Sequence, residues 1–414
     1  MGNSLRHYPN DGSPSDPWQI TPEKTDRRDE SIVQTPIADT EEGNSEIYYD
    51  SGSSTNIASL PDEMVFEILL HLSAEHIYSE ARFVCQKWYD TTNTRNFIHE
   101  HLRRSTPGLV IKCGNDPMKQ PITVSMRRGR IEISKFSYEL KGFYWYGCDG
   151  LFLHRDSSGS VLYITNPATN RHFALPESVS STSPYSCSFL AYASTSMAYK
   201  LVQTYNCPDK IPIVRDCAVL TVGVDQSRRL VHTQHLSTAA RQLLKYIPLT
   251  IEGFIHWTKK PQGTDRVVTL NVETEVITET RLPVDYGSER LMYYLSTGAS
   301  LTLLVECSEF SWGFWNLKSE TGEWAQLPDI DLESRKGKLV NFVSENRRRC
   351  SCPVNLRPVG WLNHGEVLVL HGSRFSGVCV LYNVRTQAID FFMLDYECIT
   401  HMFDSHRSSL VSLD

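Results

Sequence analysis

The sequence lacks the long apolar runs of a membrane protein. A membrane-spanning helix needs a run of about 18 apolar residues, whereas the longest apolar stretches here, such as 217–224 and 298–305, have the length of a strand. Cys-x-x-Cys pairs are also missing and the 11 cysteines are scattered, which argues against a zinc site and favours free thiols. We therefore expect a soluble protein of the cytoplasm, the nucleus or both.

The motifs of common catalytic sites are missing as well. The sequence has no Gly-rich phosphate loop, no Gly-x-Ser-x-Gly turn and no His-Glu-x-x-His pair. Its 14 histidines are dispersed, and we interpret the pair His99 and His101 as part of a solvated helical face rather than a metal site. No cysteine has neighbours that would lower the pKa of its thiol. These absences predict a protein without catalytic activity, metal or cofactor.

Charge of one sign is concentrated at the N-terminus. Residues 1–57 contain 11 acidic and 4 basic residues, whereas the rest of the chain contains 37 of each. The same segment is rich in Ser, Thr and Pro and has too few apolar residues to offset the entropy of ordering, so we expect a disordered acidic leader. The neutral remainder gives no support to binding of nucleic acid or of a membrane surface.

Residues 58–102 have the pattern of short amphipathic helices. Apolar residues recur at three-and-four spacing through the stripe Leu60, Met64/Val65, Ile68/Leu69 and Leu72. Pro61 suits the first position of a helix, where no backbone donor is needed. Further runs at 74–80 and 83–89 complete a prediction of three helices. About 45 residues are too few for a self-sufficient core, so this segment needs a partner or a neighbouring domain.

The motifs within this segment resemble the F-box. They are Leu60-Pro61, Phe66-Glu67-Ile68-Leu69, Leu72 and Val84-Cys85-Gln86-Lys87-Trp88. The departures are Gln86, where a basic residue is common, and Ser73-Ala74, where Pro is common. The resemblance implies docking on the Skp adaptor of a Skp–cullin–F-box ubiquitin ligase. The residues that would form or support that surface are Leu60, Pro61, Val65, Ile68, Leu69, Leu72, Val84, Cys85 and Trp88.

A different interpretation is that the helical segment packs only against the rest of its own chain. Both interpretations expect the stripe and the third helix to be buried, and they differ over what buries them. The residues concerned are Leu60, Ile68, Leu69, Leu72, Val84 and Trp88.

After a short polar linker at 103–107, residues 108–414 read as an all-β domain. Strands of four to eight residues alternate with Gly, Asn, Asp, Ser and Pro turns, and only 237–245 suggests a helix. Four units repeat a strand, a hairpin and an Asn-containing turn, with the asparagines at 166, 271, 316 and 383. Segments 108–136 and 218–231 have room for further units. An α+β multidomain protein with a β-propeller of five or six units is predicted.

This region resembles the kelch-like F-box-associated β domains of plant F-box proteins. The motifs that carry the resemblance are Cys148-Asp149-Gly150-Leu151-Phe152, Asn166 to Arg171, Glu252 to Trp257 and a final segment, 409–413, similar to the closing strand of that family. The resemblance implies a domain that captures a target protein for ubiquitination and proteasomal degradation.

Two features of the β domain have more than one interpretation. Its tryptophans at 145, 257, 312, 315, 324 and 361 are expected to fill the core between blades, rather than to form a solvent-facing ligand platform. The basic insertion 335–357, with Lys336, Lys338 and Arg347-Arg348-Arg349, is expected to be an exposed loop.

The sequence therefore predicts a non-catalytic substrate-recognition subunit of a ubiquitin ligase. Its partners would be a Skp-family adaptor, through it a cullin-RING ligase, and an unknown target protein. Two alternatives stay open, namely an F-box receptor for a small molecule or glycan and a non-ligase interaction protein. The residues that bind the target cannot be read from the sequence.

Overall fold

The computed structural model describes residues 57–413, with gaps at 114–118, 128, 136–144, 156–160, 177–186, 208–213, 259–264, 284–289, 346–354, 373–376 and 395–400. Residues 56–414 cluster as one unit by their internal contacts. The predicted acidic leader, apart from Ile57, lies outside the described residues. No helix among those described is long and apolar enough to cross a membrane.

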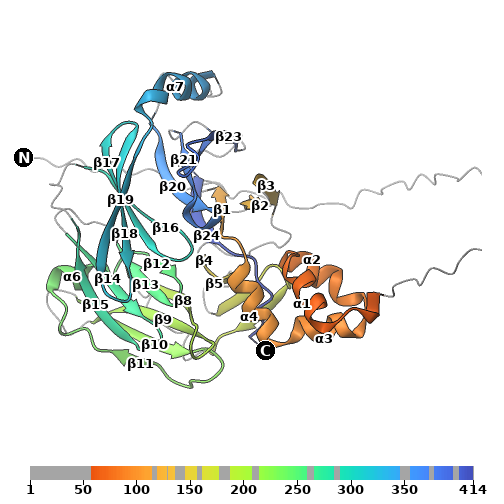
Figure 1. Cartoon of the computed structure of the whole chain (residues 1–414). Coiled ribbons are helices and arrows are strands. Elements are labelled where there is room, and N and C mark those ends of the chain that lie inside the picture. Colours follow the sequence, from red (N-terminus) through yellow and green to blue (C-terminus); the bar gives the residue numbers. More distant parts are fainter. Residues whose placement is uncertain are drawn as a thin grey trace, which may run out of the picture. The chain divides into compact units, whose positions relative to one another are not determined.

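The N-terminal part of the described chain is helical (Figure 1). Its elements are the 3-10 turns η1 (Ile57–Ser59) and η2 (Ala81–Phe83) and the helices α1 (Asp62–Leu70), α2 (Ala74–Ser79), α3 (Gln86–Asn93) and α4 (Arg95–Arg104). The three predicted helices are present. The fourth, α4, was not predicted, and it extends into the stretch 103–107 that the sequence suggested as a linker.

Helix α4 also corrects the interpretation of His101. Thr94 caps the helix by accepting a hydrogen bond from the backbone N–H of Phe97 at 3.2 Å. Phe97 and Leu102 are buried on the same side of the helix as His101, which is only 4% exposed. The Nε2 atom of His101 lies 2.9 Å from the carbonyl oxygen of Leu72, and burial lowers the pKa of the imidazole. The expected solvated face is therefore wrong for His101.

Six four-stranded antiparallel sheets follow. The first contains β24 (His401–His406), β1 (Gly108–Cys113), β2 (Ile122–Arg127) and β3 (Arg130–Lys135), and the second β4 (Trp145–Cys148), β5 (Leu151–Arg155), β6 (Leu162–Asn166) and β7 (Arg171–Ala174). The third contains β8 (Cys187–Ala193), β9 (Ala198–Cys207), β10 (Val214–Thr221) and β11 (Arg229–Val231), and the fourth β12 (Leu249–Ile251), β13 (Phe254–Trp257), β14 (Arg266–Asn271) and β15 (Val276–Arg281). The last two contain β16 (Met292–Ser296), β17 (Leu301–Ser308), β18 (Ser311–Lys318) and β19 (Glu323–Asp331), then β20 (Arg357–Leu362), β21 (Val367–His371), β22 (Val378–Asn383) and β23 (Ile389–Met393).

The sheets form a closed ring. One edge strand of each sheet contacts the corresponding strand of the next sheet. These strands follow one another in the order β4, β8, β12, β16, β20 and β24, and β24 in turn contacts β4. Strand β24 comes from the end of the chain, yet it pairs antiparallel with β1, from Gly108 opposite His406 to Cys113 opposite His401. The fold is thus a six-bladed β-propeller whose first blade is completed by the C-terminal strand. This confirms the predicted propeller and resolves its blade count.

The closing strand lies earlier than predicted. The sequence suggested 409–413, whereas the structure places the strand at His401–His406 and leaves 407–413 without regular secondary structure. The physical reason is that a side chain, and not a neighbouring strand, forms hydrogen bonds with the backbone of this segment. The side-chain amide of Asn166 donates to the carbonyl oxygens of Ser409 at 2.9 Å and Val411 at 2.8 Å.

The repeated sequence motifs correspond to two kinds of turn. Hairpin turns such as Asp149-Gly150 and Glu252-Gly253 have positive φ at both central residues, the conformation that favours glycine in two-residue hairpins. The repeated asparagines form side-chain turns, since the Oδ1 atom of Asn166 accepts from a backbone N–H two residues on, and those of Asn271 and Asn383 from N–H groups two and three residues on. Asn316 is the exception, because its buried Oδ1 has no partner.

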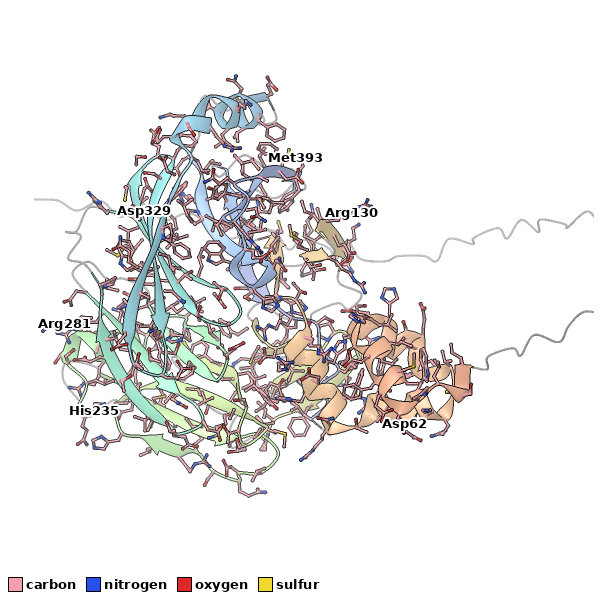
Figure 2. All side chains as sticks on the ribbon, in the orientation of Figure 1. Asp62, Arg130, His235, Arg281, Asp329 and Met393 are labelled. Atoms are coloured by element: carbon pink, nitrogen blue, oxygen red, sulfur yellow. The ribbon has the colours of Figure 1, made fainter. Side chains whose placement is uncertain are left out.

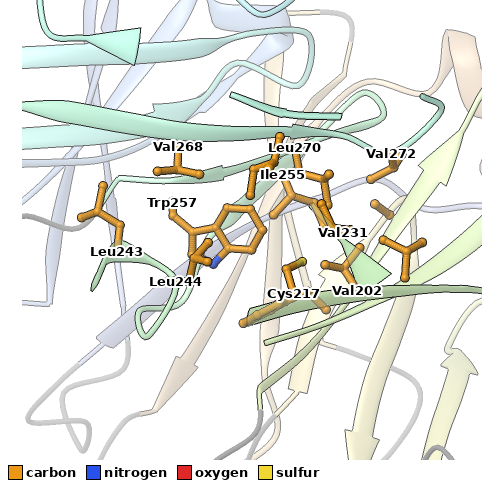
Figure 3. Packing of buried hydrophobic residues seen from close by; sticks show 14 of the residues in the cluster. Val202, Cys217, Val231, Leu243, Leu244, Ile255, Trp257, Val268, Leu270 and Val272 are labelled. Carbon is orange, nitrogen blue, oxygen red and sulfur yellow. The ribbon is translucent and has the colours of Figure 1, made fainter. Parts of the chain in front are cut away.

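Large apolar side chains fill the space between blades. Trp257 is fully buried beside Val268 and Leu270, and it faces Cys217 of the preceding blade (Figure 3). The expected helix near 237–245 is α6 (Thr238–Leu243), and its last residue joins the same cluster. The tryptophans that are buried, as predicted, are Trp257, Trp312, Trp315 and Trp361, whereas Trp324 is half-buried. The side chain of Trp145 lies outside the described part.

The basic insertion is partly helical rather than a loop. Helix α7 spans Lys336–Glu345 and follows the 3-10 turn η3 (Glu333–Arg335). Another 3-10 turn, η4 (Asn363–Gly365), lies beyond the insertion, between β20 and β21. Leu339 and Val343 of α7 are buried four residues apart in a core cluster, so apolar spacing explains the helix that the sequence reading missed. The Arg347–Arg349 run lies outside the described residues.

The cysteines differ in part from the expectation of free thiols. Six described cysteines are free, namely Cys85, Cys148, Cys187, Cys217, Cys307 and Cys379, whereas Cys113 is disulfide-bonded. Burial raises the pKa of the Cys148, Cys217 and Cys379 thiols. Raised pKa values disfavour the reactive thiolate at these three positions.

Gly150 offers a test of how tightly residues 407–409 pack on the second blade. A Cβ atom at Gly150 would lie 2.6 Å from the carbonyl oxygen of Arg407, whereas one at Gly223 would meet nothing within 4 Å. Both glycines have positive φ, so Gly223→Ala should cost only about 1 kcal/mol for the backbone conformation. Gly150→Ala should lower the free energy of unfolding by about 1–3 kcal/mol more than Gly223→Ala, because the added methyl group overpacks the contact. Urea unfolding of the two variants measures the difference. Equal losses would show that this contact does not form.

The buried imidazole of His256 predicts a loss of stability in acid. Its Nδ1 atom lies 3.0 Å from the Thr269 hydroxyl, and burial lowers its pKa to about 3. The unfolded chain therefore takes up a proton near pH 6.5 that the folded chain excludes, so stability is present above that pH and falls as the pH decreases. From pH 7 to 5 this residue should remove about 2 kcal/mol from the free energy of unfolding. His256→Gln should remove that part of the pH dependence of the free energy of unfolding. The control His172→Gln, at an exposed position, should retain it.

Candidate functional site: the apolar surface of the helical segment

Helix α1 has two apolar flanks with different surroundings. Val65 and Leu69 are fully buried in the core of the helical segment. Met64 and Ile68, one position earlier on the helix, are 51% and 38% exposed. Residues four apart lie on the same side of a helix, so Met64 and Ile68 form a neighbouring apolar strip that is partly exposed in the described part of the chain.

A second group of uncovered apolar side chains lies at the start of α3. Phe83 and Val84 are 66% and 48% exposed, and Tyr89 is 44% exposed. Trp88, by contrast, is only 6% exposed and belongs to the same core as Val65. The third helix therefore contributes its tryptophan to the fold and leaves its flanking apolar residues at the surface.

Lys87 of α3 contacts the start of α1. Its ammonium group donates to the carbonyl oxygen of Leu60 and lies 2.5 Å from the carboxylate of Asp62, which is labelled on the helical segment in Figure 2. The carboxylate is largely exposed, so this ion pair adds little stability. Its consequence is geometric, because it holds the start of α1 beside α3.

The nine residues predicted to form or support the adaptor surface divide into three classes. Val65, Leu69 and Trp88 are buried, Leu60, Leu72 and Cys85 are half-buried, and Pro61, Ile68 and Val84 are exposed. The expectation that Ile68 and Val84 are buried is thus not met within this chain alone. Met64, Phe83 and Tyr89 were not among the predicted site residues, although Met64 belongs to the predicted stripe and the other two to the predicted third helix. Contact of this surface with a partner stays a prediction.

The helical segment does pack on its own β domain, and some of the nine predicted residues take part. Leu410, near the end of the chain, joins the core formed by Val65, Leu69 and Trp88. Leu102 of α4 joins a cluster of the second and third blades that also contains Val411. These contacts leave Ile68 and Val84 exposed. The interpretation of packing on the same chain is therefore correct for α4 and incomplete for α1 and α3.

The C-terminal tail, defined here as residues 407–413, links the helical segment to the propeller by polar contacts. The Ser408 hydroxyl lies 2.5 Å from the carboxylate of Glu75, and the Ser105 hydroxyl donates to the Ser408 carbonyl oxygen at 3.1 Å. On the propeller side, Asn166 holds the tail as described above, and Arg171 donates to the Ser412 hydroxyl at 2.8 Å. The tail thus contacts both parts of the chain over a few residues.

Arg407 anchors the first residue of the tail. It is 9% exposed, donates to the carbonyl oxygen of Gly298 at 2.7 Å and lies 3.4 Å from the carboxylate of Glu252. Burial raises the pKa of Asp149 in a neighbouring turn, and Arg407 opposes that shift. Turns from separate blades therefore converge on this arginine.

The propeller also contains a small cavity. A cavity of about 180 Å³ lies between the fourth and fifth blades, lined by residues that include Glu252, Phe254 and Asn316. Pockets for drug-sized ligands span about 300–1,000 Å³. No group of three or more histidines, cysteines or carboxylates suited to a metal ion occurs among the described residues either.

A small helical unit with this Leu-Pro and Val-Cys-x-x-Trp pattern, followed by a closed six-bladed propeller, defines the class of F-box proteins with a C-terminal β-propeller. The model for the F-box domain matches residues 57–100, and that for the F-box associated beta propeller domain matches residues 120–392. The second match spans more than half of the sequence. The chain belongs to the F-box associated beta propeller domain family.

Two plant proteins are similar over most of their length. The chain is 26% identical over 389 residues to an F-box/kelch-repeat protein of Arabidopsis thaliana, with 81% of this chain and 86% of the relative covered. It is 23% identical over 412 residues to an F-box protein of the same plant, with 86% and 85% covered. The predicted resemblance to plant F-box proteins is confirmed.

Likeness to solved structures is weaker. A chain of a nidogen/laminin complex matches with a TM-score of 0.41 and 10% identity over 73% of this chain and 99% of its own length. TolB from Acinetobacter baumannii matches with a TM-score of 0.41 and 6% identity over 78% of this chain and 73% of its own length. Scores of this size support no argument about the present chain.

The contact between Asn166 and the tail can be separated from its role in the turn. Asn166→Ala and Asn271→Ala both remove a side-chain turn, but only the first removes two further hydrogen bonds, those to the tail. We expect Asn166→Ala to lower the free energy of unfolding by about 1–3 kcal/mol more than Asn271→Ala. Urea unfolding measures the difference. Limited proteolysis should also cut Asn166→Ala faster between the helical segment and the propeller, and equal cutting of both variants would contradict the role of the tail.

Proposed function

We propose that this protein is the substrate-recognition subunit of a Skp–cullin–F-box ubiquitin ligase. The observation that supports this function best is the uncovered apolar strip on the F-box. Met64 and Ile68 of α1 and Phe83 and Val84 before α3 are between 38% and 66% exposed, whereas Val65, Leu69 and Trp88 are buried. Exposed apolar side chains gathered on a small unit are typical of an interaction site.

The occupant proposed for this surface is a Skp-family adaptor. Protein interfaces have an apolar centre with a polar rim, and exposed charged residues such as Glu63, Glu67 and Asp62 flank the strip here. A stable complex of standard size buries about 800 Å² on each partner. The strip alone would provide the centre of such an interface, while Val65, Leu69 and Trp88 support it from below.

The contribution of this chain is assembly rather than bond chemistry. The propeller would hold a target protein while the F-box joins the adaptor and, through it, a cullin-RING ligase. Ubiquitin transfer then gains from proximity, because a bound target has a high effective concentration near the ligase. The C-terminal tail supports this mechanism, since it ties the F-box to the propeller and so limits the positions a bound target can take.

The cellular setting follows from this proposal. A ubiquitin ligase subunit that marks targets for the proteasome would act in the cytoplasm, the nucleus or both. Its target would be a protein, recognised on a propeller surface that none of the described cavities identifies.

Adaptor binding can be tested at exposed positions that do not support the fold. Ile68→Asp places a charge on the strip of α1, and Val84→Asp places one on the exposed group before α3. For each variant, recovery of a purified Skp-family adaptor should fall about tenfold or more. Leu230→Asp is the matched control, because Leu230 is 76% exposed on β11 of the propeller. Surface changes of this kind should shift stability little, which thermal unfolding of each variant checks. Equal recovery of adaptor by all three variants and the wild type would refute the proposal.

A further inference from the structure

We propose that a small cavity where the F-box, the propeller and the C-terminal tail meet binds a phosphate group. This junction cavity has polar side chains from all three parts. They are Arg82, Thr92 and Asn93 of the F-box, Thr169 of the turn after β6, Arg171 at the start of β7, and Ser412 of the tail.

The cavity is of a size for a small oxyanion. Its volume is about 50 Å³, whereas about 10–15 Å³ on the same kind of measure holds one water molecule. A group of a few heavy atoms, such as a phosphate group, therefore fits. Asn93 and Arg171 at the cavity are exposed, so the site opens to solvent.

Arg82 supplies a positive charge that has no carboxylate partner in the described residues. Its guanidinium carbon lies 3.6 Å from the centre of the Tyr78 ring and 4.6 Å from that of Phe83, which fixes the side chain by cation–π contact. The Nε atom of Arg82 is buried without a hydrogen-bond partner. By contrast, Arg104 at the end of α4 pairs with two carboxylates, those of Glu67 and Glu100. Arg82 is thus oriented and available for an anion.

Thr169 provides an independent indication of a ligand. The residue is only 3% exposed, and its hydroxyl has no hydrogen-bond partner. A buried hydroxyl without a partner is costly, so such groups in proteins are normally satisfied. Thr386 occupies the same position after Asn383 that Thr169 occupies after Asn166, and its hydroxyl accepts from the N–H of Ala388 at 3.4 Å. The unpartnered Thr169 hydroxyl is therefore a departure from the repeat.

The charge of the lining selects an anion. Among the described residues, two arginines and no Asp or Glu line the cavity. Arg171 is held in place by its hydrogen bond to Ser412 at 2.8 Å. Two guanidinium groups and a hydroxyl donor match the several oxygens of a phosphate group, for which arginine is well suited. The phosphate can belong to free inorganic phosphate or to a phosphate monoester, and the chemistry at the cavity is the same.

Occupation of the cavity would strengthen the attachment of the F-box to the propeller. A ligand that contacts Arg82, Thr169 and the tail residue Ser412 bridges all three parts. Because it binds only the folded arrangement, it stabilises that arrangement in proportion to its concentration and affinity. Phosphate would therefore regulate how firmly the docking surface is held relative to the propeller. This inference does not depend on the adaptor.

The test compares sodium phosphate with sodium chloride at equal ionic strength and pH 7, using the full chain. Thermal unfolding should show a midpoint that rises with phosphate and saturates, and isothermal titration calorimetry should give the dissociation constant. Arg82→Gln and Thr169→Val should each weaken phosphate binding about tenfold or more. A parallel titration with O-phosphoserine, with serine as its control, distinguishes the two sources, and the stronger ligand identifies which one the site prefers.

Matched variants separate the site from general charge effects. Thr386→Val removes the equivalent hydroxyl in another blade, and Arg385→Gln removes an exposed arginine next to it. Both should bind phosphate as the wild type does. If Arg82→Gln does not fold, Arg82→Lys keeps the charge but loses the planar donors, and it should still bind more weakly.

Three results would overturn the proposal. They are no difference between phosphate and chloride in the wild type, a phosphate effect that does not saturate, and equal phosphate binding in the Arg82, Thr169 and control variants. The assay contains no adaptor, so its failure would leave the proposed function untouched, and failure of adaptor binding would leave the phosphate site untouched.

Discussion

The pairing of the last strand with the first is the interaction on which the rest of the structure depends. Strand β24 completes the blade begun by β1 and thereby closes six sheets into a ring without open edges at the seam. The tail that follows β24 then joins the core of the F-box through Leu410. Closure of the propeller and attachment of the F-box are therefore made by adjacent residues, so opening the seam would also loosen the F-box.

The same arrangement explains why some apolar residues of the F-box are buried and others are exposed. Its buried residues, with Leu410 among them, make a core that needs no adaptor. This frees the flank with Ile68 and Val84 to stay at the surface. A small helical unit short of its own core is thus completed by the tail, and its exposed flank is left for the adaptor of the proposed complex.

Local motifs were a good guide wherever the cause of the structure is local. Asp149-Gly150 and Glu252-Gly253 adopt the positive-φ hairpins that their residue types favour, and the repeated asparagines form side-chain turns except at Asn316. Interpretations failed where long-range contacts decide. Helix α7 depends on packing of Leu339 and Val343 in a distant core, and His101 is buried because α4 packs beside Leu72.

The sequence by itself determined the F-box motif, the propeller repeat and the residue types that turn the chain, because spacing and backbone preference act over a few residues. Tertiary structure alone decided that six blades close through 401–406 rather than 409–413, and which apolar residues of the F-box stay exposed. It also brought Arg82, Thr169 and Ser412 to one cavity. These outcomes depend on contacts between residues far apart in the sequence, such as Glu75 with Ser408, which are 333 positions apart, and no local pattern encodes them.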